Sequence, residues 1–100
     1  LEDFNGAIVD YTKTIELDPN DSDAYNFRAY AKAQLENYNG SMLDLSKVIE
    51  LDPKNSDAYY NRGILKVTAL KQKESGCIDL SKAKELGYEM VDEAIKEFCN

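Results

Sequence analysis

A segment of eleven residues occurs twice in the chain at a spacing of 34 residues. Residues 15–25 read IELDPNDSDAY, and residues 49–59 read IELDPKNSDAY. A repeat at a fixed period of this length predicts stacked copies of one supersecondary unit, because a single copy cannot bury its own apolar face. The repeat therefore constrains the architecture before any single residue does.

The spacing of the apolar residues predicts helices. Before the first copy they recur at i, i+3, i+4, i+7 and i+11, which is the stripe of an amphipathic helix: Phe4, Ala7, Ile8, Tyr11 and Ile15. We expect Pro19 and Pro53 to end the first and third helices, Ser22 and Ser56 to lie at helix starts, and ENYNG and KQKE to separate helices. Gly87 is expected to form a left-handed C-cap before a last helix. The chain thus predicts six helices and no strand.

The spacing between equivalent residues of the two copies increases by one residue after Arg62. Arg28 and Arg62 are 34 residues apart, whereas Asp44 and Asp79 are 35 apart. One residue must therefore be inserted near Thr68 or in the KQKE turn. An insertion inside a helix would rotate every later side chain by about 100°.

The 34-residue unit resembles the tetratricopeptide repeat, whose pattern is W-x2-L-G-x2-Y…A-x3-F…P. The residues that carry the resemblance are the aromatic starts Tyr25 and Tyr59, the small residues Ala29 and Gly63 of the first helices, the small residues Ala7, Ser41 and Gly76 of the second helices, the large residues Tyr11, Leu45 and Leu80, and the closing Pro19 and Pro53. The chain departs from the pattern at Arg28 and Arg62 in place of Leu, at Lys32 and Lys66 in place of Tyr, and in a third unit without proline.

The resemblance implies an all-α, right-handed α-solenoid of antiparallel helix pairs in one domain, residues 1–100. We expect the second helix of a truncated repeat at 1–19, full repeats at 22–55 and 56–87, and a capping helix at 88–100. The stripe Phe4, Ile8 and Tyr11 would then lose one helix that it is suited to pack against and would expose apolar area, which predicts self-association through this end of the chain.

The resemblance also implies that the first helices of the repeats line a concave groove. The predicted peptide-binding residues are Asn26, Tyr30, Gln34, Tyr60, Asn61 and Ile64, with Ala33 and Val67 beside them. Asn can bond a peptide backbone, and Tyr offers large contact area at little rotamer cost; the alternative is that these tyrosines simply cover the surface. Some relatives hold a C-terminal carboxylate through Lys and Arg on these helices. Asp23 and Asp57 lie on the equivalent surface here, so we expect no such clamp.

Charge constrains the partner. The formal charge is −7, and the twelve basic residues are scattered, which argues against nucleic acid or an anionic membrane as a partner and favours a neutral or basic protein or peptide. Arg28 with Lys32, and Arg62 with Lys66, each place two cations on one helix face, where Asp10, Asp44 and Asp79 recur on the second helices. Ion pairs between helices are the favoured interpretation, with anion binding as the alternative.

Cys77 and Cys99 are predicted to lie at the same level of two antiparallel helices that meet at the Gly87 turn. A disulfide between them is one interpretation, and two buried free thiols are the other.

No catalytic residue, metal ligand set or cofactor site is predicted. The chain has no His, no phosphate-binding glycine loop and no clustered zinc-ligand cysteines, and its carboxylates fall at helix caps or on solvated helix faces. The predicted function is a non-enzymatic scaffold for protein interaction, and the alternative is a structural spacer or self-assembly module of a larger repeat array.

Overall fold

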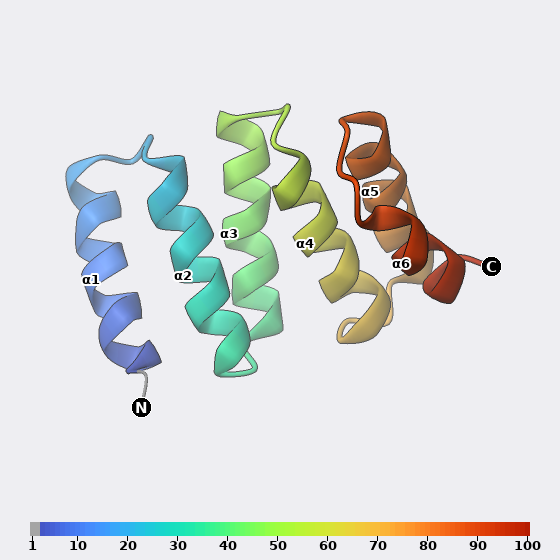
Figure 1. Ribbon diagram of the computed structural model, residues 1–100. Coiled ribbons are helices and arrows are strands. Elements are labelled where there is room, and N and C mark those ends of the chain that lie inside the picture. Colours follow the sequence, from blue (N-terminus) through green and yellow to red (C-terminus); the bar gives the residue numbers. More distant parts are fainter. Residues whose placement is uncertain (1–2) are drawn as a thin grey trace. The chain divides into compact units, whose positions relative to one another are not determined.

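The computed structural model describes residues 3–100, and this part of the chain contains six α-helices and no strand (Figure 1). The helices are α1 (Phe4–Leu17), α2 (Ser22–Gln34), α3 (Tyr38–Leu51), α4 (Ser56–Thr68), α5 (Lys73–Glu85) and α6 (Val91–Phe98). They form two compact units of three helices each, one ending at Asp52 and the other beginning at Pro53. The predicted all-α class, built from helix pairs, is confirmed.

Four helices are preceded by an Asp or Asn whose side chain accepts a hydrogen bond from the backbone N–H group three residues later. These caps are Asp3, Asp21, Asn37 and Asn55, which accept from the backbone N–H groups of Gly6, Ala24, Gly40 and Ala58. An Asx cap satisfies one of the free N–H groups of the first turn. Ser22 and Ser56 are therefore the first residues of their helices, and the caps lie one residue earlier.

The turns inside the helix pairs are shorter than the ENYNG and KQKE segments suggested. Tyr38 to Gly40 already belong to α3, and Lys73 and Glu74 belong to α5. Each chain reversal instead uses one non-glycine residue with positive φ, Glu36 at 64° and Lys71 at 53°. Because these residues are not glycine, their left-handed backbone left no signal in the sequence.

The inserted residue lies in the turn between α4 and α5. Helices α2 and α4 are both 13 residues long. The α2–α3 connection comprises residues 35–37, whereas the α4–α5 connection comprises residues 69–72. The prediction of an insertion outside the helices is confirmed, and the residues of α5 keep the faces that their counterparts have in α3.

In the first unit α2 lies between α1 and α3 (Figure 1). Its inward side chains Ala24, Tyr25, Ala29 and Ala31 are buried, as are Leu45 and Val48 of α3. The two helices approach closely at Ala29, whose carbonyl oxygen accepts a 2.8 Å hydrogen bond from the Ser41 hydroxyl. The small residues of the repeat pattern thus form the crossing point of the pair.

The second unit repeats this crossing with two glycines. A Cβ added to Gly63 would lie 2.9 Å from the Gly76 carbonyl oxygen, and a Cβ added to Gly76 would lie 2.9 Å from the Gly63 oxygen. Either substitution would force the backbones of α4 and α5 apart. These two glycines therefore set the distance between α4 and α5.

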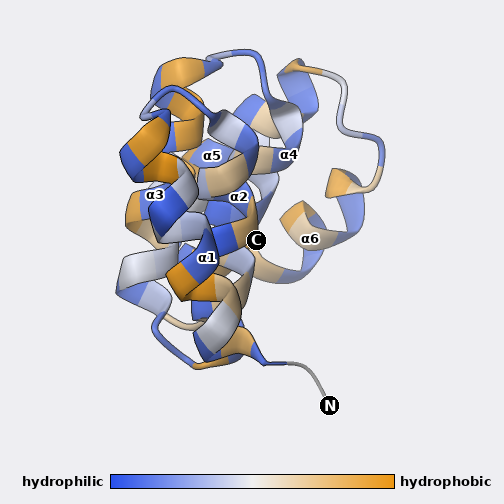
Figure 2. Cartoon of the chain, turned by 90° about the vertical axis from the view of Figure 1, so that its left-hand side faces the viewer, coloured by the Kyte–Doolittle hydropathy of each residue, from blue (hydrophilic) through white to orange (hydrophobic). Residues whose placement is uncertain are grey.

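Helix α6 completes the core of the second unit. Val91 and Ala94 form a buried cluster with Leu80 and Ala83 of α5, and Ile95 and Phe98 pack against it. The ribbon of α6 accordingly carries both hydrophobic and hydrophilic residues (Figure 2). Gly87, at a φ of 96°, provides the left-handed residue after α5, as expected.

Cys77 on α5 and Cys99 after α6 form a disulfide in the structure, with their Cα atoms 5.8 Å apart. The bridge closes a loop of 22 residues. It fixes the end of a helix that is only eight residues long and has no side-chain cap at its start. A short helix of this kind depends on tertiary contacts for its stability.

We expect the chain, unfolded without reductant, to show no reactive thiol in a colorimetric thiol assay. Reduction should lower the free energy of unfolding by about 3 kcal/mol, because the unfolded chain regains the entropy of the closed loop. The Cys77→Ser/Cys99→Ser double variant, compared with the wild type under oxidising and reducing conditions, is the control. Two reactive thiols in the unreduced protein would contradict the prediction.

Candidate protein-interaction surfaces

A buried carboxylate joins two helices in the first unit. Asp44 of α3 accepts hydrogen bonds from Arg28 of α2, at 2.8 Å from Nε and 2.7 Å from Nη2. The ammonium group of Lys32, one turn further along α2, lies 3.1 Å from the same carboxylate. The Asp44 side chain is only 5% exposed. Two cations on one helix face therefore share one acid of the facing helix.

The second unit contains the same arrangement. Arg62 donates to both carboxylate oxygens of Asp79 at 2.8 Å, and the Lys66 ammonium lies 3.0 Å from Asp79. The hydrogen bond to the acid raises the pKa of each arginine, more than burial lowers it. Each guanidinium also lies 5.7 Å from the ring centroid of a tyrosine one turn earlier, Tyr25 or Tyr59. The prediction of ion pairs between helices is confirmed.

These ion pairs largely bury the basic side chains of α2 and α4, which are the first helices of the two repeats. Between Ser22 and Gln34, and between Ser56 and Thr68, the sequence has no Lys or Arg other than the four that bind Asp44 and Asp79. Exposed acids, Asp23 and Asp57, lie in the first turns of the same helices. The exposed faces of α2 and α4 therefore carry no free cation for an anionic ligand.

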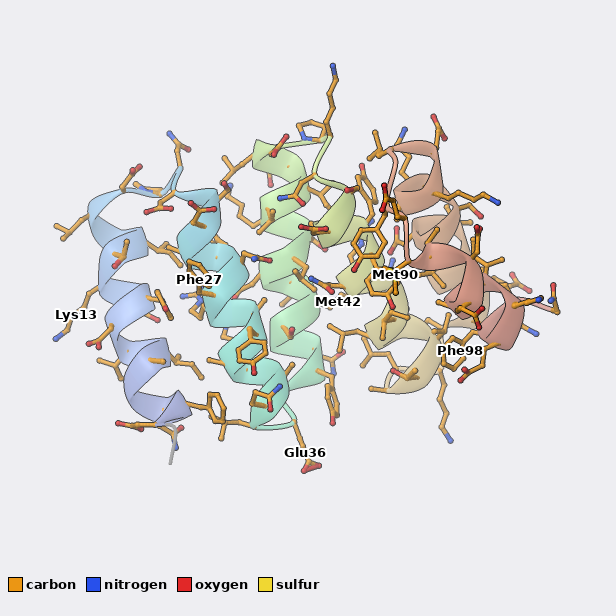
Figure 3. The ribbon with its side chains drawn as sticks, viewed as in Figure 1. Lys13, Phe27, Glu36, Met42, Met90 and Phe98 are labelled. Atoms are coloured by element: carbon orange, nitrogen blue, oxygen red, sulfur yellow. A yellow bond between two sulfur atoms is a disulfide. The ribbon has the colours of Figure 1, made fainter. Side chains whose placement is uncertain are left out.

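The exposed face of α2 is aromatic. The side chains of Phe27 and Tyr30 are 50% and 58% exposed; Figure 3 shows Phe27 on α2. Phe27 stacks on Tyr11 of α1 with ring centroids 5.6 Å apart, and Tyr30 meets Phe4 edge-on at 6.1 Å. Each ring is thus positioned by a neighbour while much of it stays in solvent.

The candidate residues of α2 differ in their exposure. Gln34 is exposed beside Tyr30, whereas Asn26 and Ala33 are partly buried. Sequence reasoning missed Phe27 as a surface residue. It occupies the position of Asn61, which was predicted to bind a peptide, so the 34-residue register itself was the signal that could have found it.

The candidate residues of α4 are more enclosed. The Tyr60 ring stacks on Tyr88 with centroids 4.2 Å apart. Tyr60, Ile64 and Val67 are partly buried and pack against the cluster formed by α5 and α6. Asn61 is exposed. In the second unit the capping helix and the turn before it thus cover part of the face that the repeat alone would leave open.

Phe4 and Tyr11, two members of the stripe on α1, have partners in α2. The ring of each therefore packs against a ring of the following helix, and self-association through this end of the chain stays a prediction. Helix α1 nevertheless contains no buried residue between Phe4 and Leu17.

Residues 3–100 contain no group of three or more Cys, Asp or Glu side chains arranged to hold a metal ion. In the same part of the chain, no helix combines the length and the apolar character that crossing a bilayer requires.

Antiparallel helix pairs at a 34-residue period, with small residues at each crossing, define a helical-repeat protein. The family model for the TPR repeat matches residues 29–67, which extend from the crossing residue of α2 into α4. Over these residues the chain is similar to tetratricopeptide-repeat proteins.

Solved structures of tetratricopeptide-repeat domains have the same fold. One is the first TPR of Spaghetti (RPAP3) bound to the HSP90 peptide SRMEEVD, with a TM-score of 0.89 at 23% identity over 96% of this chain and 77% of that one. The TPR domain of Arabidopsis OM64 gives 0.84 at 25% identity, covering 94% and 78%. The TPR2B domain of yeast Sti1, in a pHsp70 complex, gives 0.79 at 28% identity, covering 94% and 74%. A comparison with curated protein sequences finds no match.

We expect Asp44→Asn to lower the free energy of unfolding by about 3 kcal/mol, because it leaves Arg28 and Lys32 partly buried without a countercharge. Asp10→Asn is the matched control. It lies at the equivalent position of α1 but is exposed, so the change should stay within about 0.5 kcal/mol. Urea unfolding of both variants measures the difference, and equal effects would contradict the role of the ion pairs.

We also expect the second unit to lose stability above pH 10. Burial raises the pKa of Tyr88, and Tyr60 and Asp57 raise it further, above the ordinary value of about 10. The folded state therefore favours the neutral phenol of Tyr88. The contribution of this group to the free energy of unfolding is complete below its pKa in the unfolded chain, and it is lost as the pH rises through its pKa in the folded chain. Tyr88→Phe should reduce this alkaline loss, and Tyr30→Phe should not. The same loss in both variants, followed by circular dichroism, would contradict the prediction.

Proposed function

We propose that the chain is a non-catalytic scaffold that binds extended segments of a partner protein through its first helices, α2 in the first unit and α4 in the second. The observation that carries the proposal is the pair of exposed, ring-supported aromatic side chains on α2, Phe27 and Tyr30. Aromatic rings give a large contact area with little loss of side-chain entropy. The structures of RPAP3 and yeast Sti1 as peptide or chaperone complexes support a binding role for this fold.

Each unit has its own proposed contact residues. In the first unit they are Asn26, Phe27, Tyr30 and Gln34 of α2, and in the second unit they are Tyr60, Asn61 and Ile64 of α4. Because Tyr60 and Ile64 are already packed in their own unit, we expect α2 to contribute most of the apolar contact area. Asn61 is exposed, and its amide can bond the backbone of an extended segment.

The proposed partner is neutral or basic. All four cations of the first helices are held by Asp44 and Asp79, and the chain has a formal charge of −7. A peptide rich in carboxylates would meet repulsion without a compensating ion pair. The acidic peptide that the RPAP3 domain binds is therefore a disfavoured ligand for this chain.

Two labelled heptapeptides test the charge preference by fluorescence anisotropy. The probes are SRMEEVD and a counterpart in which lysine replaces each of its three acidic residues. We expect the lysine peptide to bind more tightly, and raising the salt concentration should reduce the difference. Tighter binding of SRMEEVD would contradict a neutral or basic partner.

Tyr30→Ala should weaken binding of the lysine peptide about tenfold, which corresponds to about 1.4 kcal/mol. The matched control is Leu43→Ala, which removes a side chain of similar exposure, 65%, from the second helix α3. It should leave the dissociation constant unchanged. Equal effects of the two variants would show that α2 is not the binding face.

A second candidate function is that of a module within a larger helical assembly. It is favoured by α1, which lies at the edge of the first unit without a buried residue. Under this proposal residues 1–19 are the second helix of a truncated repeat, 22–55 and 56–87 are full repeats, and 88–100 form the capping helix. The exposed side of α1 would then be an interface, either for another helix or for a second copy of the chain.

A further inference from the structure

Four positions on α1 differ from their counterparts in α3 and α5. Each of the latter helices buries four residues, among them the small residue and the acid that contact its first helix: Ser41, Asp44, Leu45 and Val48 on α3, and Gly76, Asp79, Leu80 and Ala83 on α5. The 34- and 35-residue offsets place Ala7, Asp10, Tyr11 and Thr14 at the same positions of α1. None of these four is buried, and Asp10 is exposed.

The helices that cover α3 and α5 share one chemical pattern. Each presents an arginine, a small residue directly after it, and a lysine four residues after the arginine: Arg28, Ala29 and Lys32, or Arg62, Gly63 and Lys66. The small residue lets the backbones approach, and both cations bind the acid. Helices α3 and α5 each have a small residue followed three positions later by Asp. Each of them is thus covered by a helix with the same Arg, small residue and Lys pattern.

We propose that α1 is a docking surface for an α-helix that presents Arg, a small residue next to it, and Lys four residues after the Arg. Ala7 leaves room for close approach, as Ser41 and Gly76 do. Asp10 supplies the carboxylate at the position of Asp44 and Asp79, and two cations brought over it would be paired and desolvated together. The proposal rests on the second candidate function, the assembly module, and defines its partner.

A folded second copy of the chain does not supply this helix. Within residues 3–100 the only arginines are Arg28 and Arg62, and each already binds an acid of its own unit. Moving either to Asp10 would leave Asp44 or Asp79 buried without its countercharge, at the cost of a broken buried ion pair. The occupant is therefore a helix from outside these residues.

An extended chain tests the proposal without a free ligand. A copy of residues 21–36 is placed directly before Asp3, so that the copied arginine precedes Asp10 by 16 residues, the separation of Arg28 from Asp44. Asp3 caps α1 through Gly6 as Asn37 caps α3 through Gly40, so the copied turn enters the helix in the same way. We expect hydrogen exchange of the α1 amides to slow at least about tenfold relative to the unextended chain.

Two matched variants of the extended chain test the chemistry. Asp10→Asn, and replacement of the copied arginine and lysine by methionine, should each restore most of the exchange rate of α1. Asp10→Asn in the unextended chain should leave that rate unchanged, because no cation lies over it there.

Three results would overturn the proposal. The first is an extended chain whose α1 exchanges as fast as before, and the second is protection that survives Asp10→Asn, which would mean that apolar contacts alone hold the helix. The third is an unextended chain that sediments as a dimer with α1 already protected, which would make a second copy the occupant. Because no peptide enters these measurements, failure of the proposed binding face on α2 would not affect them.

Discussion

The buried carboxylate between the two helices of a pair is the interaction on which the rest of the structure depends. Asp44 and Asp79 are each held by an arginine and a lysine from the facing helix. These cations replace the leucine and tyrosine of the family pattern, so ionic contacts occupy positions where that pattern has apolar ones. A buried ion pair adds little net stability compared with an apolar core, but a misplaced one is costly. Its clearest effect here is to fix how α2 lies on α3, and α4 on α5.

The same pairs determine the chemistry of the exposed faces. Because Arg28, Lys32, Arg62 and Lys66 point inward, the first helices present aromatic, amide and acidic groups to solvent. The fold is shared with domains that appear in complexes with chaperone peptides, yet it does not determine which ligand a member binds. The ligand preference follows from which side chains the ion pairs leave available.

The repeat predicted most of the fold and less of the surface. The period, the small residues Ala29 and Gly63, and the offset after Arg62 defined the helix pairs and even the location of the inserted residue. The turns within the helix pairs were predicted to be longer than they are, because Glu36 and Lys71 adopt positive φ without being glycine. The enclosure of Tyr60 and Ile64 was not predictable from the period either, since α6 and Tyr88, which cover them, have no counterpart elsewhere in the repeat.

Asp10, Asp44 and Asp79 show why a pattern in sequence cannot by itself distinguish core from surface. The three acids share one register position, and two are nearly inaccessible while the third is exposed. Only the presence of a first helix over α3 and α5 makes the difference. An acid in that position is unfavourable to bury alone and favourable to bury against two cations. It therefore selects its covering helix by charge as well as by shape, which apolar residues at the same position could not do.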